Sequence, residues 1–421
     1  MRSDVHQIKL ADCVDLLAGY TFKSDRFTDT PDDIALVKGE NVGQGAILWD
    51  IAKRWPASEW DALARFQLRA DDVVIAMDRP WVPAGLKWAH IRADAPKALL
   101  VQRCSRLRAS TPKLDQGFLR FVIGGPEFES YIRPITTGVN VPHISGKQIL
   151  DFAFPLPPIA TQRRIASILS AYDDLIENCQ RRIRILEDMA RGLYREWFVH
   201  FRFPGADTLP RVDSPLGPIP KGWAVASLPE CVHINPRVKV PREGDKPFVP
   251  MGCLANGSML ITDTEVRTGN SGAKFQNGDT LFARITPCLE NGKTGFVQFL
   301  PDAQAVAFGS TEFIVLRSRT LTPEFVYLLA RSDAFRNNAI KSMTGASGRQ
   351  RVQEKCFDTY RLAQPPRELL DRFSAIVAPS FRLIQQLHLR ADNLRRTRDL
   401  LLPRLLSGQI DVGVAEESVP A

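Results

Sequence analysis

The sequence predicts an α+β protein in which two similar, mixed α/β units are separated by two long helices that pair as an antiparallel coiled coil. Two observations lead to this prediction: an internal repeat, and a heptad pattern that follows a proline pair in each repeat. The chain has 421 residues, of which 44% are hydrophobic and 24% are charged. Such a composition is typical of a chain that folds around a core, and the length suits two or three domains of about 100–200 residues each.

The repeat is visible in segments that lie far apart in the sequence. Pro158 in PLPPIATQRRIASIL and Pro366 in LAQPPRELLDRFSAIV are 208 residues apart, and matching residues after both prolines keep this register. Farther upstream, DDVVIAMDRPWVPAG (71–85) resembles GDTLFARITPCLENG (278–292) at a distance of 207 residues. One insertion or deletion separates the two blocks. Because chance matches rarely keep their register within such separate segments, we expect a duplication whose two units form a pseudo-twofold repeat.

Each long helical pattern carries apolar residues at alternating steps of three and four, which is the repeat of a coiled coil. Each seam occurs once in the chain, so we expect the two helices to pair with each other; packing of each helix on its own unit is the alternative. A helix of about 36 residues would be roughly 54 Å long. The predicted seam consists of Ile165, Leu169, Ile176, Ile183, Leu186 and Leu193 in the first helix, and of Val377, Ile384, Leu387, Leu394 and Leu401 in the second.

The second helical pattern contains two prolines and two polar defects in its seam, Ser380 and Arg398. Proline lacks the N–H donor and its ring clashes with the preceding turn, so Pro379 and Pro403 predict a kink near residue 379 and an end near residue 402. Ser407-Gly408 supplies a natural stop. Arg398 interrupts the apolar seam, which leaves the packing partner of this stretch open.

Charge and cysteine content narrow the class of protein. The net charge of +8 favours a polyanionic partner such as nucleic acid, although a basic protein without such a partner is equally compatible with it. The seven cysteines form no CxxC pair and the six histidines are scattered, which favours free thiols in the cytoplasm and predicts no metal site. Neither a signal-peptide pattern nor a run of about 20 apolar residues is found, so we expect no membrane association.

The sequence contains only partial matches to catalytic motifs. NGKTG (291–295) ends like a phosphate-binding loop, but Pro287 stands where the pattern requires a glycine. INPR (234–237) is only a fragment of the Asn-Pro-Pro-aromatic motif that positions an adenine for methylation, and no glycine-rich cofactor loop precedes it. We therefore expect no catalytic residue and no bound cofactor in this chain.

Two pairs of loops occupy equivalent places in the two repeats and combine cations, amides and glycines. The first pair is 77–87 with 283–293, and the second is 136–147 with 344–355. Arg and Lys suit guanine, Asn and Gln suit adenine, and glycine lets the backbone approach a phosphate. The alternative is that the glycines and prolines only form turns and the charges are solvated. The residues predicted to contact DNA are Arg79, Lys87, Thr136, Asn140, His143, Lys147, Arg284, Lys293, Ser347, Arg349, Gln350 and Arg351.

Four segments of the sequence resemble one known protein family. The segment PLPPIATQRRIASILSAYDDLIENCQRRIRILEDMARGLYREWFVHF (155–201) resembles the central region of type I restriction–modification specificity subunits, and LRRTRDLLLPRLLSGQIDV (394–412) resembles their C-terminal region. MDRPWVPAG (77–85) and ARITPCLENGKTGFV (283–297) look like segments of their target-recognition domains. The resemblance implies target-recognition domains at 1–157 and 203–365, coiled-coil helices at 158–202 and 366–410, and a flexible tail at 411–421.

The resemblance also implies a non-catalytic subunit that reads double-stranded DNA. Each target-recognition domain would read one half of a bipartite site, and the helices would set the gap and dock two methylase subunits. Those methylases would use S-adenosylmethionine to modify adenine, and motor–nuclease subunits would use ATP and Mg. A coiled-coil scaffold protein that does not read DNA, and a stand-alone DNA-modifying enzyme, are the alternatives that the sequence leaves open.

Overall fold

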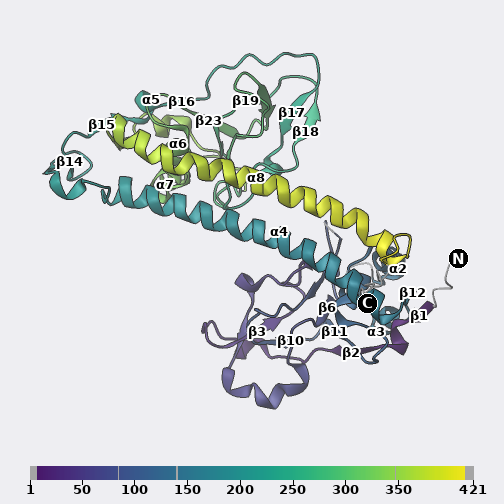
Figure 1. The fold of residues 1–421 in the computed structure, drawn as a ribbon. Coiled ribbons are helices and arrows are strands. Elements are labelled where there is room, and N and C mark those ends of the chain that lie inside the picture. Colours follow the sequence, from purple (N-terminus) through teal and green to yellow (C-terminus); the bar gives the residue numbers. More distant parts are fainter. Residues whose placement is uncertain (1–6, 84, 139–140, 347, 413–421) are drawn as a thin grey trace, which may run out of the picture. The chain divides into compact units, whose positions relative to one another are not determined.

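The computed structural model describes residues 7–83, 85–138, 141–346 and 348–412 (Figure 1). The chain divides into two compact units. The first unit comprises Met1–Asp174 together with Leu394–Ala421, and the second comprises Leu175–Asn393. The fold is mixed α/β, and each unit contains a part of both long helices, α4 (Ile159–Tyr194) and α8 (Arg367–Leu406).

Two sheets form the body of the first unit. The segments IALV and VVIA are buried at every position, as expected for strands that are covered on both faces. One sheet has the order β2-β11-β6-β9-β4 and the other β10-β3-β5, and two short antiparallel pairs, β1–β12 and β7–β8, complete the described strands. The strand bounds are β1 Gln7–Lys9, β2 Val14–Ala18, β3 Ile34–Val37, β4 Gln44–Gly45, β5 Arg54–Trp55, β6 Val73–Ala76, β7 Trp81–Val82, β8 Gly85–Leu86, β9 Trp88–His90, β10 Ala98–Leu100, β11 Cys104–Ala109 and β12 Ala153–Pro155.

Helices α1 (Gln116–Ile123), α2 (Pro126–Ile135) and α3 (Gly146–Leu150) follow these sheets along the chain. Helix α1 begins where the side chain of Asp115 accepts a hydrogen bond from the N–H of Phe118 at 2.9 Å, which satisfies one of the free donors of the first turn. Its apolar face and that of α2 share one hydrophobic core with the first half of α4 and the last turns of α8.

The second unit repeats this plan. Its sheets have the orders β16-β23-β20-β21 and β18-β17-β22-β19, with the pairs β13–β14 and β15–β24. Its helices are α5 (Leu228–Cys231), α6 (Pro323–Arg331) and α7 (Asp333–Lys341). The strand bounds are β13 Arg211–Val212, β14 Ile219–Pro220, β15 Ala224–Ser227, β16 Val232–Ile234, β17 Lys246–Val249, β18 Glu265–Arg267, β19 Ala273–Gln276, β20 Thr280–Ala283, β21 Thr294–Phe296, β22 Val306–Gly309, β23 Phe313–Ser318 and β24 Arg361–Gln364.

The two units agree in strand pairing as well as in order. The antiparallel series β2-β11-β6-β9 corresponds to β16-β23-β20-β21. The pair β10–β3 is parallel, and so is its counterpart β22–β17. The strands next to the long helices, β1–β12 and β15–β24, are antiparallel in both units.

A buried ion pair also recurs at the same place in both units. Arg108 Nη2 lies 2.7 Å from Asp72 Oδ2, and Arg317 Nη2 lies 2.6 Å from Asp279 Oδ2. Each aspartate directly precedes the strand (β6 or β20) beside the arginine's own strand, and its side chain is at most 3% exposed. A buried carboxylate without a partner costs several kcal/mol, so the arginine is required wherever this aspartate is kept.

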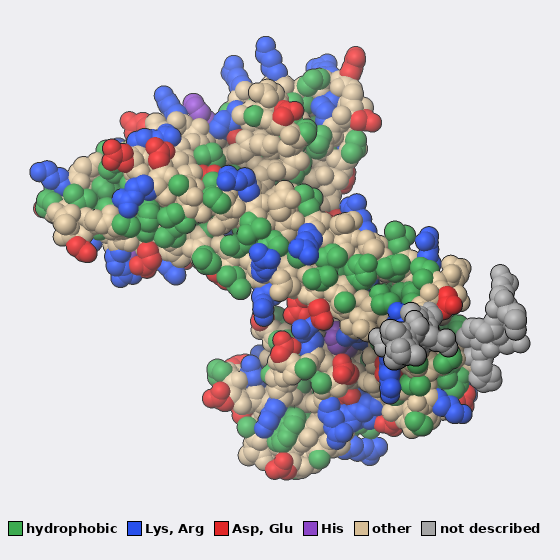
Figure 2. All heavy atoms as spheres, viewed as in Figure 1, with side chains coloured by type: hydrophobic (Ala, Val, Ile, Leu, Met, Phe, Trp, Pro, Cys, Tyr) green, Lys and Arg blue, Asp and Glu red, His purple; other side chains and the backbone are tan. Residues whose placement is uncertain are grey.

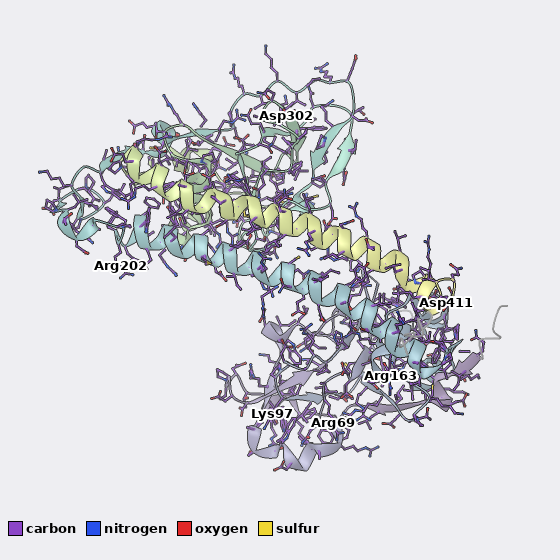
Figure 3. The ribbon with its side chains drawn as sticks, in the orientation of Figure 1. Arg69, Lys97, Arg163, Arg202, Asp302 and Asp411 are labelled. Carbon is purple, nitrogen blue, oxygen red and sulfur yellow. The ribbon has the colours of Figure 1, made fainter. Side chains whose placement is uncertain are left out.

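Within the first unit, α4 is tied to the globular part by a buried amide. Gln162 Nε2 donates to the carbonyls of Lys113 at 2.7 Å and Pro157 at 2.8 Å, and its Oε1 accepts from Asp115 N at 2.8 Å. Arg163, on the same turn, lies 3.7 Å from the carboxylate of Asp115 (Figure 3). The first turn of α4 is therefore fixed by polar contacts as well as by its apolar face.

Within the second unit, the same helix is held by a buried carboxylate. Glu187 accepts hydrogen bonds from Ser258 Oγ and Met259 N, both at 2.7 Å, and Arg191 donates to the carbonyl of Gly257 at 3.1 Å. Rings of the π-helical segment Arg195–Val199 that follows α4 pack on α8, with 5.9 Å between the centroids of Trp197 and Phe373.

The predicted seam residues of both helices lie in hydrophobic surroundings. Ile165 and Leu169 share a cluster with Leu402 and Leu405 in the first unit. In the second unit the cluster contains Ile183 of α4 with several α8 residues. Most of the predicted positions are buried: Ile165, Leu169, Ile176, Ile183, Val377, Ile384 and Leu387. The others are half-buried: Leu186, Leu193, Leu394 and Leu401.

Arg398 has a partner on the other helix. Its Nη1 lies 2.6 Å from Asp173 Oδ1 of α4, and Asp173 also contacts Arg120 of α1 at 3.4 Å. Burial alone would lower the pKa of Arg398, but the carboxylates of Asp173 and Asp399 raise it overall. The polar interruption of the apolar seam is thus a paired charge within the first unit.

The predicted end of the second helix was wrong. Helix α8 continues through Pro379 and Pro403 and ends at Leu406. The carbonyls left without an N–H partner belong to Ala375 and Asp399, and both of these residues are exposed, so water can satisfy them. The predicted stop is confirmed: Gly408 has a φ of +71°, and its N–H donates to Leu405 O at 3.3 Å.

Each of the seven cysteines is a free thiol, and burial raises the pKa of Cys104 to about 12. In the part of the chain that the structure describes, no helix is long and apolar enough to cross a membrane. The predicted flexible tail after residue 412 lies outside the described residues.

The half-buried imidazole of His90 on β9 makes stability depend on pH. Burial, followed by the charge of Arg120 at 3.0 Å, lowers the pKa of His90 from 6.5 to about 4. The unfolded chain binds this proton at higher pH than the folded chain, so the stabilising contribution is complete above pH 6.5. It is lost as the pH falls from 6.5 towards 4, by about 3 kcal/mol in the free energy of unfolding.

Urea unfolding at pH 7 and pH 4.5 tests this. The variant His90→Gln should lose about 2–3 kcal/mol less than the wild-type chain between these pH values. A matched control, His233→Gln at an exposed position, should behave as the wild type. Equal losses in His90→Gln and wild type would show that His90 titrates normally in the folded chain.

Candidate nucleic-acid interface

The two predicted loops of the first unit lie side by side. His143 forms β-bridges with both Asp78 and Thr137. The N–H of Ile144 donates to Met77 O, and the N–H of Arg79 donates to Pro142 O, both at 2.8 Å. The described residues of 77–87 and 136–147 therefore form one continuous surface, which we call the first edge.

The second unit joins its loops through equivalent contacts. Arg351 forms β-bridges with both Ile285 and Thr344. The N–H of Val352 donates to Arg284 O at 2.8 Å, and the N–H of Thr286 donates to Gln350 O at 3.1 Å. The described residues of 283–293 and 344–355 form the second edge. The sequence paired each loop with its equivalent in the other repeat, and the structure joins the two predicted loops within each unit.

The predicted residues differ in how they are placed on these edges. Exposed side chains that face solvent belong to Arg79, Lys147, Arg349 and Arg351. Thr136 is half-buried, because its hydroxyl donates to the carbonyl of Ile132 at the end of α2, and Gln350 is half-buried as well. Asn140 and Ser347 lie outside the described residues. Lys and Arg side chains are visible on the surface of both units in Figure 2.

Three of the predicted cations make internal contacts. Lys87 Nζ donates to Gly39 O, and Lys293 Nζ donates to Met251 O at 3.1 Å. Arg284 lies 2.8 Å from the carboxylate of Glu354 and donates to Val352 O at 3.1 Å. Burial lowers the pKa of Lys87. The lysines hold equivalent loops in the two units by the same kind of bond, which is a positioning role.

Two arginines that the sequence analysis did not identify donate hydrogen bonds to backbone carbonyls of the second edge. Arg331 of α6 donates to Gly292 O, and Arg336 of α7 donates to Glu290 O at 3.0 Å. Gly292 has a φ of +74°, a conformation that favours glycine. The glycine of the incomplete phosphate-loop pattern thus serves a tight turn.

A charged cluster at each edge was also missed. On the first edge, Asp78 contacts His143 Nδ1 at 2.5 Å and Arg103 Nη1 at 3.0 Å. On the second edge, Glu312 accepts from Nε of Arg351 at 3.0 Å and from Nη2 at 2.7 Å. Arg351 lowers the pKa of Glu312 through these hydrogen bonds. Arg103 and Glu312 each directly precede the equivalent strands β11 and β23, so the repeat was the signal that could have identified them.

The donors and charges of the two edges suit direct contact with a polyanion. Each edge offers guanidinium, imidazole or hydroxyl donors on a backbone fixed by bridges, beside exposed cations that can approach phosphates. Among the described residues, no group of three histidine, cysteine, aspartate or glutamate side chains could hold a metal ion. The two units thus present similar joined-loop surfaces that carry exposed cations.

Comparison with known proteins finds relatives in one family. Residues 3–187 match the type I restriction modification DNA specificity domain. The MjaIX type I restriction enzyme specificity subunit of Methanocaldococcus jannaschii is 24% identical over 308 residues, which are 70% of this chain and 69% of the relative. The EcoAI specificity subunit of Escherichia coli is 31% identical over 173 residues, 41% of this chain and 28% of the relative.

A solved structure agrees over the whole length. The type I restriction–modification S subunit from M. genitalium has a TM-score of 0.59 and 13% sequence identity, and the match covers 98% of each chain. At this identity the likeness concerns the fold. The domain match and the likeness to named relatives confirm the resemblance to type I restriction–modification specificity subunits that the sequence indicated.

Lys293 makes an internal hydrogen bond and Arg349 is exposed, so their substitution should affect stability differently. Lys293→Met removes a charged donor to Met251 O, which keeps only the long hydrogen bond from Leu254 N at 3.4 Å, so the free energy of unfolding should fall by about 1–3 kcal/mol. Arg349→Met, at an exposed position, should change it by less than about 0.5 kcal/mol. Urea unfolding of the purified variants measures both values, and equal effects would contradict the positioning role of Lys293.

Proposed function

We propose that this chain is the DNA-reading subunit of a type I restriction–modification complex and that each unit reads one half of a bipartite site. The observation that carries the proposal is the repetition of one construction: two loops are joined by the same backbone contacts in both units, with different side chains on the joined loops. A fixed backbone with variable side chains is what reading two different short sequences requires.

Exposed cations supply the affinity that does not depend on sequence. Arg79 and Lys147 on the first edge and Arg349 on the second are exposed, and phosphate contacts by such residues position a duplex. We assign the internal cations Lys87, Arg284 and Lys293 to holding the loops in place. Thr136, Asn140, His143, Ser347, Gln350 and Arg351 remain the candidates for contacts to bases or sugars.

The long helices act as the spacer between the half-sites. The contacts of Asp173 with Arg398 in the first unit and of Trp197 with Phe373 in the second support an antiparallel pairing of α4 and α8. Helix α4 has 36 residues and α8 has 40, so each is roughly 55–60 Å long at about 1.5 Å per residue. We infer that a spacer of this length sets the gap between the two half-sites.

The chemistry belongs to partners that dock on the helices. Among the described residues of α4, the apolar side chains of Ile185 and Met189 are 49% and 63% exposed, one turn apart on the same face. On α8, Ile376 and Leu383 are 52% and 37% exposed. Figure 2 shows such apolar side chains along the helices. We assign the face of α4 that carries Ile185 and Met189, together with these α8 side chains, to contact with an adenine methylase subunit that supplies the S-adenosylmethionine chemistry, with ATP and Mg used by a motor–nuclease subunit.

The function is tested by co-expressing the chain with its adenine methylase and mapping N6-methyladenine in the host DNA. We expect methylation at one bipartite motif with a constant gap. Exchanging residues 1–157 for those of a relative should change one half-site and leave the other unchanged. Methylation at no defined motif, despite a stable complex, would favour a scaffold protein that does not read DNA.

The docking face is tested by one added charge. Met189→Lys keeps a good helix former but places an ammonium in the proposed contact, so methylase binding should weaken about tenfold or more. Gln180→Lys, at an exposed position on another face of α4, is the control and should bind as the wild type. Titration of labelled methylase measures both, and a normal affinity for Met189→Lys would exclude this face.

A further inference from the structure

The ion pair of the second edge fixes one arginine in a defined orientation. Nε and Nη2 of Arg351 both face the carboxylate of Glu312, and 48% of the arginine side chain is exposed against 21% of the glutamate side chain. The backbone of both residues is also fixed. Arg351 bridges Ile285 and Thr344, and the carbonyl of Glu312 accepts from Arg284 N at 3.0 Å.

The donors of this guanidinium can be accounted for one by one. A guanidinium has N–H donors on Nε, Nη1 and Nη2 in a planar fork, and Glu312 occupies the side formed by Nε and Nη2. The end of the fork keeps one outward N–H on each of Nη1 and Nη2. Two parallel donors match the two acceptors O6 and N7 that guanine presents in the major groove.

Other partners fit this arrangement less well. Adenine offers one acceptor beside an amino donor, which would oppose one of the two N–H groups, and thymine offers one acceptor beside a methyl group. A phosphate would approach the carboxylate of Glu312 as well as the cation, and the paired charge offers little net attraction. The exposed Arg349 on the same edge suits phosphate better.

The comparison with the first edge supports a reading role. In the first unit, Arg103 and His143 occupy the positions of Glu312 and Arg351, and both contact Asp78. In the second unit, Ile285 occupies the position of that aspartate. The buried pairs Asp72–Arg108 and Asp279–Arg317 are identical in both units. The repeat thus kept its structural pairs and changed its chemistry at this place on the edge.

We propose that Arg351 reads a guanine in the half-site of the second unit, and that Glu312 is a positioning residue that sets the angle of its guanidinium. This inference rests on the function proposed above. It adds the identity of one base and the two residues that recognise it. Loss of Arg351 should relax selectivity at one position of one half-site.

The test maps N6-methyladenine in cells that express the methylase with the wild-type chain, Arg351→Ala, Arg351→Lys, Glu312→Gln or Arg349→Ala. In the wild type, the half-site of the second unit, identified by exchange of residues 1–157, should contain a guanine. Arg351→Ala should reduce selectivity for that guanine about tenfold to a hundredfold, with the other half-site and the gap unchanged. Arg351→Lys keeps the charge without the fork and should relax the same position.

The remaining variants separate reading from positioning and from general affinity. Glu312→Gln should relax the same position by a smaller factor, because the guanidinium stays but its orientation is less fixed. Arg349→Ala should lower the extent of methylation at an unchanged motif. A defined wild-type motif that stays equally selective in both Arg351 variants would overturn the inference, as would relaxation at an A·T pair. The absence of any motif in the wild type would instead overturn the proposed function.

Discussion

The backbone hydrogen bonds that join two loops in each unit are the constraint on which the rest of the structure depends. Loops without regular structure cannot present side chains at fixed distances unless something else holds them. Here the N–H groups of Ile144 and Val352 pair with carbonyls of Met77 and Arg284, at the ends of equivalent strands of each sheet. The sheets, helices and buried ion pairs of each unit serve to bring these two chain segments to the same place.

Much of this plan could be predicted because it rests on local pattern and on repetition. The heptad spacing indicated two long helices, and the repeat indicated which loops correspond. The end of α8 could not be predicted, because a proline is tolerated where the freed carbonyl faces water, and exposure of Asp399 is a property of the fold. Nor could the sequence separate Lys87 and Lys293 from truly exposed cations, since their acceptors, Gly39 O and Met251 O, lie more than forty residues away.

The same limit explains the residues that were missed. Asp78, Arg103 and Glu312 gain their importance from neighbours that only the fold supplies, although the repeat placed Arg103 and Glu312 at equivalent positions. Arg398 is the converse case. In the heptad pattern it is a polar residue at an apolar position. In the structure the carboxylate of Asp173 pairs with it in the first unit. A charge paired across two helices restricts their register.

The energies of the two kinds of ion pair explain how such a repeat can acquire a different specificity in each unit. Removing one partner of a buried pair such as Asp279–Arg317 leaves an uncompensated charge at a cost of about 3–5 kcal/mol, which is a large fraction of the stability of a domain. An exposed pair contributes about 0–1 kcal/mol, so exchanging Arg103 and His143 for Glu312 and Arg351 at an edge barely affects folding. Stability therefore constrains the interior of both units to the same chemistry, whereas the joined loops are free to change the bases that they contact.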